Sequence, residues 1–139
     1  MATRSNIGIV NEDGSITGIY CHWDGYPEYV GKILLNHYNT ADIVNNLMKL
    51  GDLSSLGENL FPTEPHSFET PQKGVCVAYG RDRGEKGVES RLFKSLSQFE
   101  RHMNDSCAEY QYVFDHTGKW AFRGYKTDWK DLTPADCKM

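Results

Sequence analysis

The chain has 139 residues, a length that suits one domain with a single hydrophobic core. Hydrophobic residues make up 39% of it and charged residues 24%, which is ordinary for a globular protein and excludes an intrinsically disordered chain. Fifteen Lys and Arg against 19 Asp and Glu give a net charge of −4, which argues against a general nucleic-acid-binding protein. No stretch approaches the length of a membrane span, so we expect a soluble, intracellular protein without a membrane partner.

The cysteines do not form a recognisable framework. Cys21, Cys76, Cys107 and Cys137 are scattered singly through a chain that lacks a secretion signal, so reduced thiols are expected. No C-x-x-C pair occurs, and a zinc site would have to be assembled from distant ligands. We therefore expect neither a metal nor a cofactor.

Two β-rich segments open the chain. Residues 7–10 and 15–21 flank an Asn-Glu-Asp-Gly turn, whose Asp-Gly pair favours the positive φ of a tight hairpin. Alternation along the second strand places Tyr20 and His22 on the same face.

Two helices are predicted next. Pro27 suits the first turn of a helix that runs to about Tyr38, because its missing N–H costs nothing there. Thr40 is typical of the cap of a second helix that ends at Leu50, before Gly51. Both segments carry apolar residues at the spacing of one buried stripe.

The middle of the chain reads as loops around one strand. Residues 52–73 carry three prolines among polar residues and predict a long loop, with one helical turn at 53–56. Residues 74–79 are β-rich and predict a central strand. Residues 80–87 form a polar, glycine-punctuated loop.

The last third predicts a helix and a hairpin. Residues 95–104 begin with a Ser-x-x-Gln capping pattern, and residues 109–114 and 119–123 alternate aromatic and polar side chains. Residues 125–139 form a C-terminal tail. The order β-β-α-α-β-α-β-β predicts a single α+β domain over residues 1–139, with a five-stranded antiparallel sheet and helices packed mainly on one face.

The junction between the second strand and the first helix is the main candidate site. It concentrates aromatic rings, an imidazole and a carboxylate where rigid elements meet, which suits a ligand or partner site. In the alternative interpretation the tryptophan and the last tyrosine are core residues, the aspartate caps the helix and the histidine is half-buried. The candidate binding residues are Tyr20, His22, Trp23, Asp24, Tyr26 and Tyr29.

Two arginines in the loop at 80–87 are added to this candidate site. The guanidinium groups of Arg81 and Arg83, with flexible glycine backbone around them, could hold phosphate or carboxylate. The alternative is a solvated loop whose interleaved acidic residues compensate the arginines. If the strand at 74–79 lies beside the second strand, both arginines approach His22 and complete one pocket.

Five segments of the sequence carry a resemblance. They are MATRSxIxI at 1–9, NEDGSITGIYCHWDGYP at 11–27, GKILL at 31–35, LGDLSSLG at 50–57 and YGRDRG at 79–84. With these segments the chain resembles a family of small proteins carried by bacteriophages and prophages. The resemblance implies a viral accessory protein expressed in the cytoplasm of a bacterial host.

Three functional hypotheses follow. The leading one is a phage accessory protein that acts by binding a host protein or a small anionic or nucleotide ligand, and so inhibits a host defence system. The second is an enzyme acting on a nucleotide or other phosphorylated small molecule, with His22 as acid or base; we favour it less. The third is a protein–protein interaction module that uses the aromatic hairpin, with Tyr110 and Trp120 at the interface. A homo-oligomer is compatible with all three.

Overall fold

The computed structural model of the protein describes residues 2–115, 117–125 and 127–138. In chain order its strands are β1 (Ser5–Val10), β2 (Ile16–Cys21), β3 (Leu53–Ser55), β4 (Val77–Ala78), β5 (Arg91–Phe93), β6 (Tyr110–Phe114), β7 (Trp120–Gly124) and β8 (Lys130–Asp131). Its helices are η1 (Pro27–Gly31), a π-helical turn, α1 (Lys32–His37), α2 (Ala41–Leu50), α3 (Tyr79–Arg83), α4 (Leu96–Asp105) and η2 (Pro134–Cys137), a 3-10 turn.

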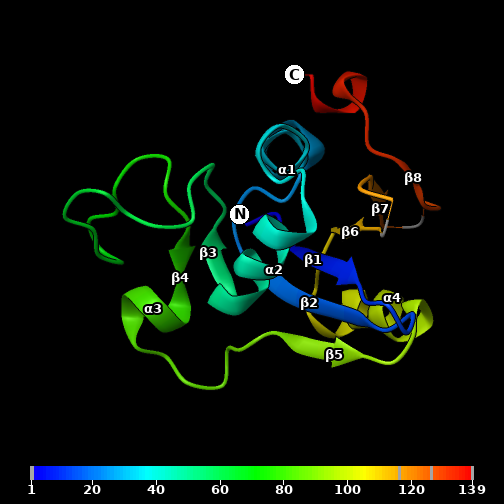
Figure 1. Ribbon diagram of the computed structural model, residues 1–139, viewed down its shortest axis with the longest axis horizontal. Coiled ribbons are helices and arrows are strands. Elements are labelled where there is room, and N and C mark those ends of the chain that lie inside the picture. The colour runs from blue at the N-terminus through cyan, green and yellow to red at the C-terminus, as the bar shows by residue number, and fades with distance from the viewer. Residues whose placement is uncertain (1, 116, 126, 139) are drawn as a thin grey trace.

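The fold is α+β, as predicted, but its sheet is larger than expected. The strand order is β4-β3-β2-β1-β6-β7-β8, and β5 also pairs with β2 (Figure 1). The predicted purely antiparallel pairing is wrong, because β1 runs parallel to β6 and β2 runs parallel to β3. The additional strands have two or three residues each, too few for a recognisable sequence pattern.

Both predicted hairpins are confirmed. In the first, Asn11 N–H donates to Ser15 O at 2.7 Å and Gly14 takes a φ of +86°, which a side chain would disfavour. In the second, Tyr112 pairs with Phe122 across β6 and β7. The parallel pairing of β1 with β6 joins the two hairpins into one sheet.

Helices cover both faces of the sheet. One face carries Ile7 and Ile19, which belong to the large core under η1, α1 and α2. The opposite face carries Ile16 and Val113, which pack with Phe99 of α4. The predicted helical layer on one face is therefore present, and α4 forms a second layer behind the sheet.

Buried polar bonds fasten the first helical layer to the sheet. The Tyr38 hydroxyl donates to Gly57 O at 2.7 Å, and Trp120 Nε1 donates to Tyr38 O at 2.8 Å. Thr40 caps α2 as predicted, since its Oγ1 accepts from Ile43 N–H at 3.3 Å.

Helix α4 begins at the predicted cap. Ser95 Oγ accepts from Gln98 N–H at 3.3 Å, and Gln98 Oε1 accepts from Lys94 N–H at 2.9 Å. Phe99 and Met103 are buried on the sheet.

The segment after α2 corrects three local predictions. The helical turn expected at 53–56 is strand β3, because Leu53 pairs with both Cys21 and Ala78. The central strand expected at 74–79 is the two-residue β4 at the edge of the sheet. The first residues of the loop expected at 80–87 belong to α3.

The C-terminal segment folds onto the domain. It contains β8, which pairs with β7, and η2, which lies against η1 and α1. Leu132 and Cys137 are 5% and 6% exposed and belong to the large core. The tail predicted over 125–139 is thus, in its described part, packed against the domain.

Candidate functional site

The predicted junction presents three side chains in a row at the end of β2. The Tyr20 hydroxyl and His22 Nδ1 are 2.7 Å apart, and the rings of His22 and Trp23 meet edge-on with centroids 5.0 Å apart. Trp23 N–H donates to Ser54 O at 2.9 Å, which fixes this row beside β3.

A tight turn after this row directs the chain into η1. Asp24 adopts a φ of +59°, in the left-handed region. Gly25 follows, and a Cβ there would lie 2.7 Å from Ser5 Cβ, so no side chain fits. Tyr112 donates its hydroxyl hydrogen to Gly25 O at 2.6 Å and anchors the turn on the sheet.

This turn leaves the large aromatic residues accessible. Trp23 is 41% exposed and Tyr29 is 37% exposed, so the interpretation of both as core residues is wrong. Tyr29 also donates from its hydroxyl to Leu56 O at 3.2 Å. Asp24 does not cap the helix, because the cap residue of η1 is the half-buried Tyr26, which makes no side-chain capping bond.

Electrostatics define the state of the imidazole. Burial lowers the pKa of His22, and the charge of Arg4 lowers it further, which favours the neutral ring. Burial raises the pKa of Tyr20, so its hydroxyl keeps the proton and can donate it to Nδ1. His22 Nδ1 is thereby engaged within the protein.

Arg81 and Arg83 lie in different environments. The Arg81 guanidinium donates to Leu60 O, to Cys76 O at 2.7 Å and to the Asp82 carboxylate at 2.9 Å. These bonds give Arg81 a structural role, because they hold one backbone carbonyl of the long loop and another just before β4.

Arg83 instead faces two aromatic rings. Its guanidinium carbon lies 5.2 Å from the ring centroid of Phe68 and 5.8 Å from that of Tyr79, and the two rings are 5.7 Å apart. Tyr79 directly follows β4, which pairs with β3, and Trp23 N–H bonds to Ser54 of β3, so this group lies on the same side of the sheet as the predicted junction.

Arg83 therefore lies among aromatic rings on the same side of the sheet as the predicted junction. The Arg81 guanidinium is instead occupied by bonds within the protein. We use the name aromatic surface for two neighbouring groups, the row of Tyr20, His22 and Trp23 at the end of β2 and the cluster of Phe68, Tyr79 and Arg83 beside β4. Phe68 and Tyr79 were missed because nothing local in the sequence places them beside β2.

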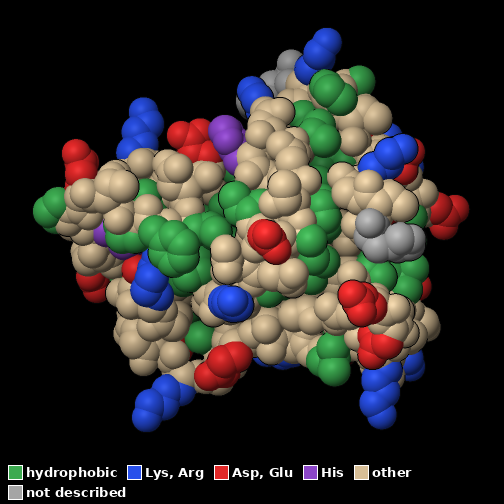
Figure 2. Space-filling view, viewed as in Figure 1, with side chains coloured by type: hydrophobic (Ala, Val, Ile, Leu, Met, Phe, Trp, Pro, Cys, Tyr) green, Lys and Arg blue, Asp and Glu red, His purple; other side chains and the backbone are tan. Residues whose placement is uncertain are grey.

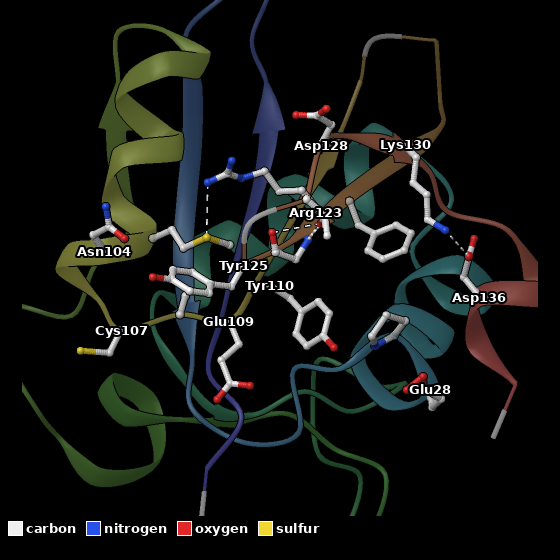
Figure 3. Close-up of a pocket in the computed structure, with 16 residues that line it drawn as sticks. Glu28, Asn104, Cys107, Glu109, Tyr110, Arg123, Tyr125, Asp128, Lys130 and Asp136 are labelled. Atoms are coloured by element: carbon white, nitrogen blue, oxygen red, sulfur yellow. Dashed lines mark hydrogen bonds and ion pairs between the residues drawn. The ribbon is translucent and has the colours of Figure 1, made fainter.

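A groove elsewhere on the protein was not predicted from the sequence. A groove of about 870 Å³ opens between the start of η1, the end of α4, the β6–β7 pair and the segment after β7 (Figure 3). Four separate segments build it, so no local sequence signal could have found it. In the aromatic hairpin, Tyr112, Trp120 and Phe122 are buried in the core, so Trp120 is not available at an interface, and Tyr110 is half-buried at the groove.

Comparisons of the chain with protein-family models, with curated proteins and with solved structures found no significant match. Among the described residues, no three His, Cys, Asp or Glu side chains are grouped as a metal ion would require. Within the same residues, no helix combines the length and the apolar character needed to cross a membrane.

Proposed function

We propose that the protein is a bacteriophage accessory protein that acts by binding a host protein, and that this binding inhibits a host defence system. The viral assignment rests on the resemblance of the five sequence segments. The binding mode rests on one observation, the aromatic surface at the β3–β4 end of the sheet. Figure 2 shows hydrophobic side chains gathered over β3 and β4 on the face that it displays.

The composition of the aromatic surface supports a protein partner. Trp, Tyr and Arg contribute the largest free energies at protein interfaces, because they bury much area at a low entropic cost. Trp23 packs against the His22 ring, and the Arg83 guanidinium lies over two rings, so neighbours hold both side chains before a partner arrives. Such preorganisation lowers the entropic cost of binding.

A second candidate is an anionic, planar ligand such as a nucleotide. Its supporting observation is that Arg4 lies near Tyr20 and His22 while Arg83 lies over Phe68, so positive charge accompanies the ring faces. Stacking and guanidinium contacts together suit a base with a phosphate.

The test immobilises the protein and its variants, exposes them to bacterial lysate, and quantifies retained proteins by mass spectrometry. Trp23→Ala should reduce recovery of the partner at least tenfold, a typical cost of losing a central aromatic residue. Leu92→Ala is the matched control, because Leu92 is 68% exposed on β5 outside the aromatic surface. Equal recovery by both variants would exclude the aromatic surface as the interface.

Native mass spectrometry of the purified protein separates the two candidates. A mass excess that disappears on denaturation would show a retained small molecule and favour the anionic ligand. A bare chain mass, together with a partner that depends on Trp23, would support the protein-binding proposal.

A further inference from the structure

We propose that the groove between η1, α4 and the β6–β7 pair binds a positively charged, Lys- or Arg-bearing segment of a protein partner. This inference is independent of the proposed function, because none of the residues of the aromatic surface lines the groove.

The acidic side chains of the groove are the first observation. Glu28, Glu109 and Asp128 line it, and within the described residues none of the three forms an ion pair. In Figure 3, Glu28 and Glu109 lie on either side of Tyr110. The carboxylates of both residues raise the pKa of Tyr110, after the larger effect of burial, which places their charge close to the phenol.

The basic residues of the described lining do not neutralise these carboxylates. Lys130 Nζ is 2.9 Å from Asp136 Oδ1, and the two charges compensate each other. Arg123 turns away from Glu28 and Glu109, since its Nε donates to the buried Gln111 Oε1 at 3.0 Å. The described groove therefore presents an unbalanced negative charge to solvent.

The walls of the groove suit the rest of a basic side chain. Tyr110, Phe122 and Tyr125 supply aromatic rings, and Tyr125 is 60% exposed. Such rings accept the aliphatic stems of lysine and arginine and attract their cationic ends. The groove already contains one such contact, because Lys130 Nζ lies 5.2 Å from the ring centroid of Phe122.

The volume favours a peptide over a single amine. About 870 Å³ lies near the upper end of the range of roughly 300–1,000 Å³ that holds drug-sized ligands. One lysine or arginine side chain would fill a small part of this space, whereas several residues of an extended segment would fill it and reach carboxylates on both sides of Tyr110.

The test uses isothermal titration calorimetry at low salt with an N-acetylated, C-amidated tetra-arginine peptide. Tetra-glutamate serves as the opposite-charge probe and spermine as a small polycation. We expect the arginine peptide to bind and tetra-glutamate to show no heat. Raising the ionic strength should lower the affinity for the arginine peptide, because salt screens the partly exposed charges that supply part of the attraction.

Paired charge variants locate the site. The double variant Glu28→Gln and Glu109→Gln should lower the affinity for the arginine peptide about tenfold or more. The double variant Glu64→Gln and Glu69→Gln removes the same charge from the exposed long loop and should leave affinity within about twofold.

Three results would overturn the inference. They are equal affinity of the two double variants, heat from tetra-glutamate comparable with that from the arginine peptide, and binding of spermine without binding of the peptide. Thermal unfolding of each variant confirms that the fold is retained, because all four substituted side chains are at least partly exposed.

Discussion

At the scale of single residues, a buried glutamine joins α4 to the sheet. Gln111 is 0% exposed, and its Nε2 donates to Asn6 Oδ1 at 3.0 Å and to Phe99 O at 2.6 Å. Its Oε1 accepts from Arg123 Nε at 3.0 Å. A satisfied polar group of this kind fixes one arrangement of the layers, because any other arrangement leaves buried partners unpaired.

Replacing this glutamine should therefore be costly. Gln111→Met preserves the length of the side chain but leaves the Asn6 oxygen and the Arg123 guanidinium short of partners, so we expect the free energy of unfolding to fall by about 2–4 kcal/mol. Urea denaturation measures the change. Adding Arg123→Met should recover part of the loss, whereas strictly additive effects would show that the two side chains are not coupled.

The close approach at Gly25 gives a second prediction. Gly25→Ala should lower the free energy of unfolding by about 1–3 kcal/mol, because the added Cβ meets Ser5 Cβ at 2.7 Å and Thr3 O at 2.9 Å. It should also weaken partner binding, since Trp23 precedes the displaced turn. Gly80→Ala is the control, because its nearest neighbour would be Val88 Cγ2 at 3.5 Å; a similar loss for both variants would contradict the steric explanation.

Two histidines predict a pH dependence of stability. Burial lowers the pKa of His102, and Arg91 lowers it further; burial and Arg4 have the same effect on His22. In the folded protein, the pKa of each histidine lies below its ordinary value of 6.5. Between the folded pKa and 6.5, the unfolded chain therefore binds more protons than the folded protein does. The free energy of unfolding should thus fall as the pH drops below 6.5 through this window.

Denaturant titrations from pH 7.5 to pH 5 measure this loss. The double variant His22→Gln and His102→Gln should show a shallower dependence on pH than the unmodified protein. An unchanged slope would mean that other groups carry the proton linkage.

At the scale of elements, one ion-pair cluster holds the long loop against α3. Asp82 receives hydrogen bonds from Ala78 N–H at 2.8 Å and from Arg81, and His66 Nε2 lies 3.1 Å from its Oδ2. His66 Nδ1 accepts from Gln72 N–H at 2.9 Å. Burial alone would raise the pKa of Asp82, but the bonds from Arg81, Ala78 and His66 hold it below the ordinary value.

Breaking this cluster should open the loop. Asp82→Asn removes a charge that faces His66 and Arg81 with a side chain 5% exposed, so we expect a loss of about 2–4 kcal/mol. Relative to the unmodified protein, the variant should exchange amide hydrogens faster over residues 58–76, with a smaller change over β1 and β6. Glu85→Gln is the control, because the Arg83–Glu85 pair is exposed and should contribute less than about 1 kcal/mol.

Sequence patterns predicted the elements whose signals are local. The Asp-Gly turn, the Thr40 and Ser95 caps and the alternation of the last hairpin each depend on neighbouring residues, and the structure has all of them. Strands β3, β5 and β8 depend on the partners that tertiary folding supplies, and so does the edge position of β4, which lies within the predicted strand at 74–79. Two or three residues carry no usable periodicity, so the sequence predicts a helical turn at 53–56 where the structure has strand β3.

At the scale of the whole molecule, the two candidate sites also differ in how far local sequence signals predict them. The row Tyr20, His22 and Trp23 could be predicted because one strand and one turn determine it. The cluster of Phe68 and Arg83 beside β4, and the groove beside β6 and β7, required the arrangement of segments far apart in sequence. The sheet brings these segments together, so their side chains could not be combined from the sequence.

The parallel pairing of β1 with β6 also bears on how the protein is made. On the ribosome, β1 and β2 emerge first, yet the inner edge of β1 has no partner until Tyr110–Phe114 has been synthesised. Such non-local pairing delays folding, and the nascent chain carries an open, apolar strand edge until β6 has been synthesised. A chain terminated within α4 would keep that edge permanently. Its expected fate is aggregation or degradation, so a nonsense codon anywhere before Tyr110 should eliminate the protein as completely as one within β1.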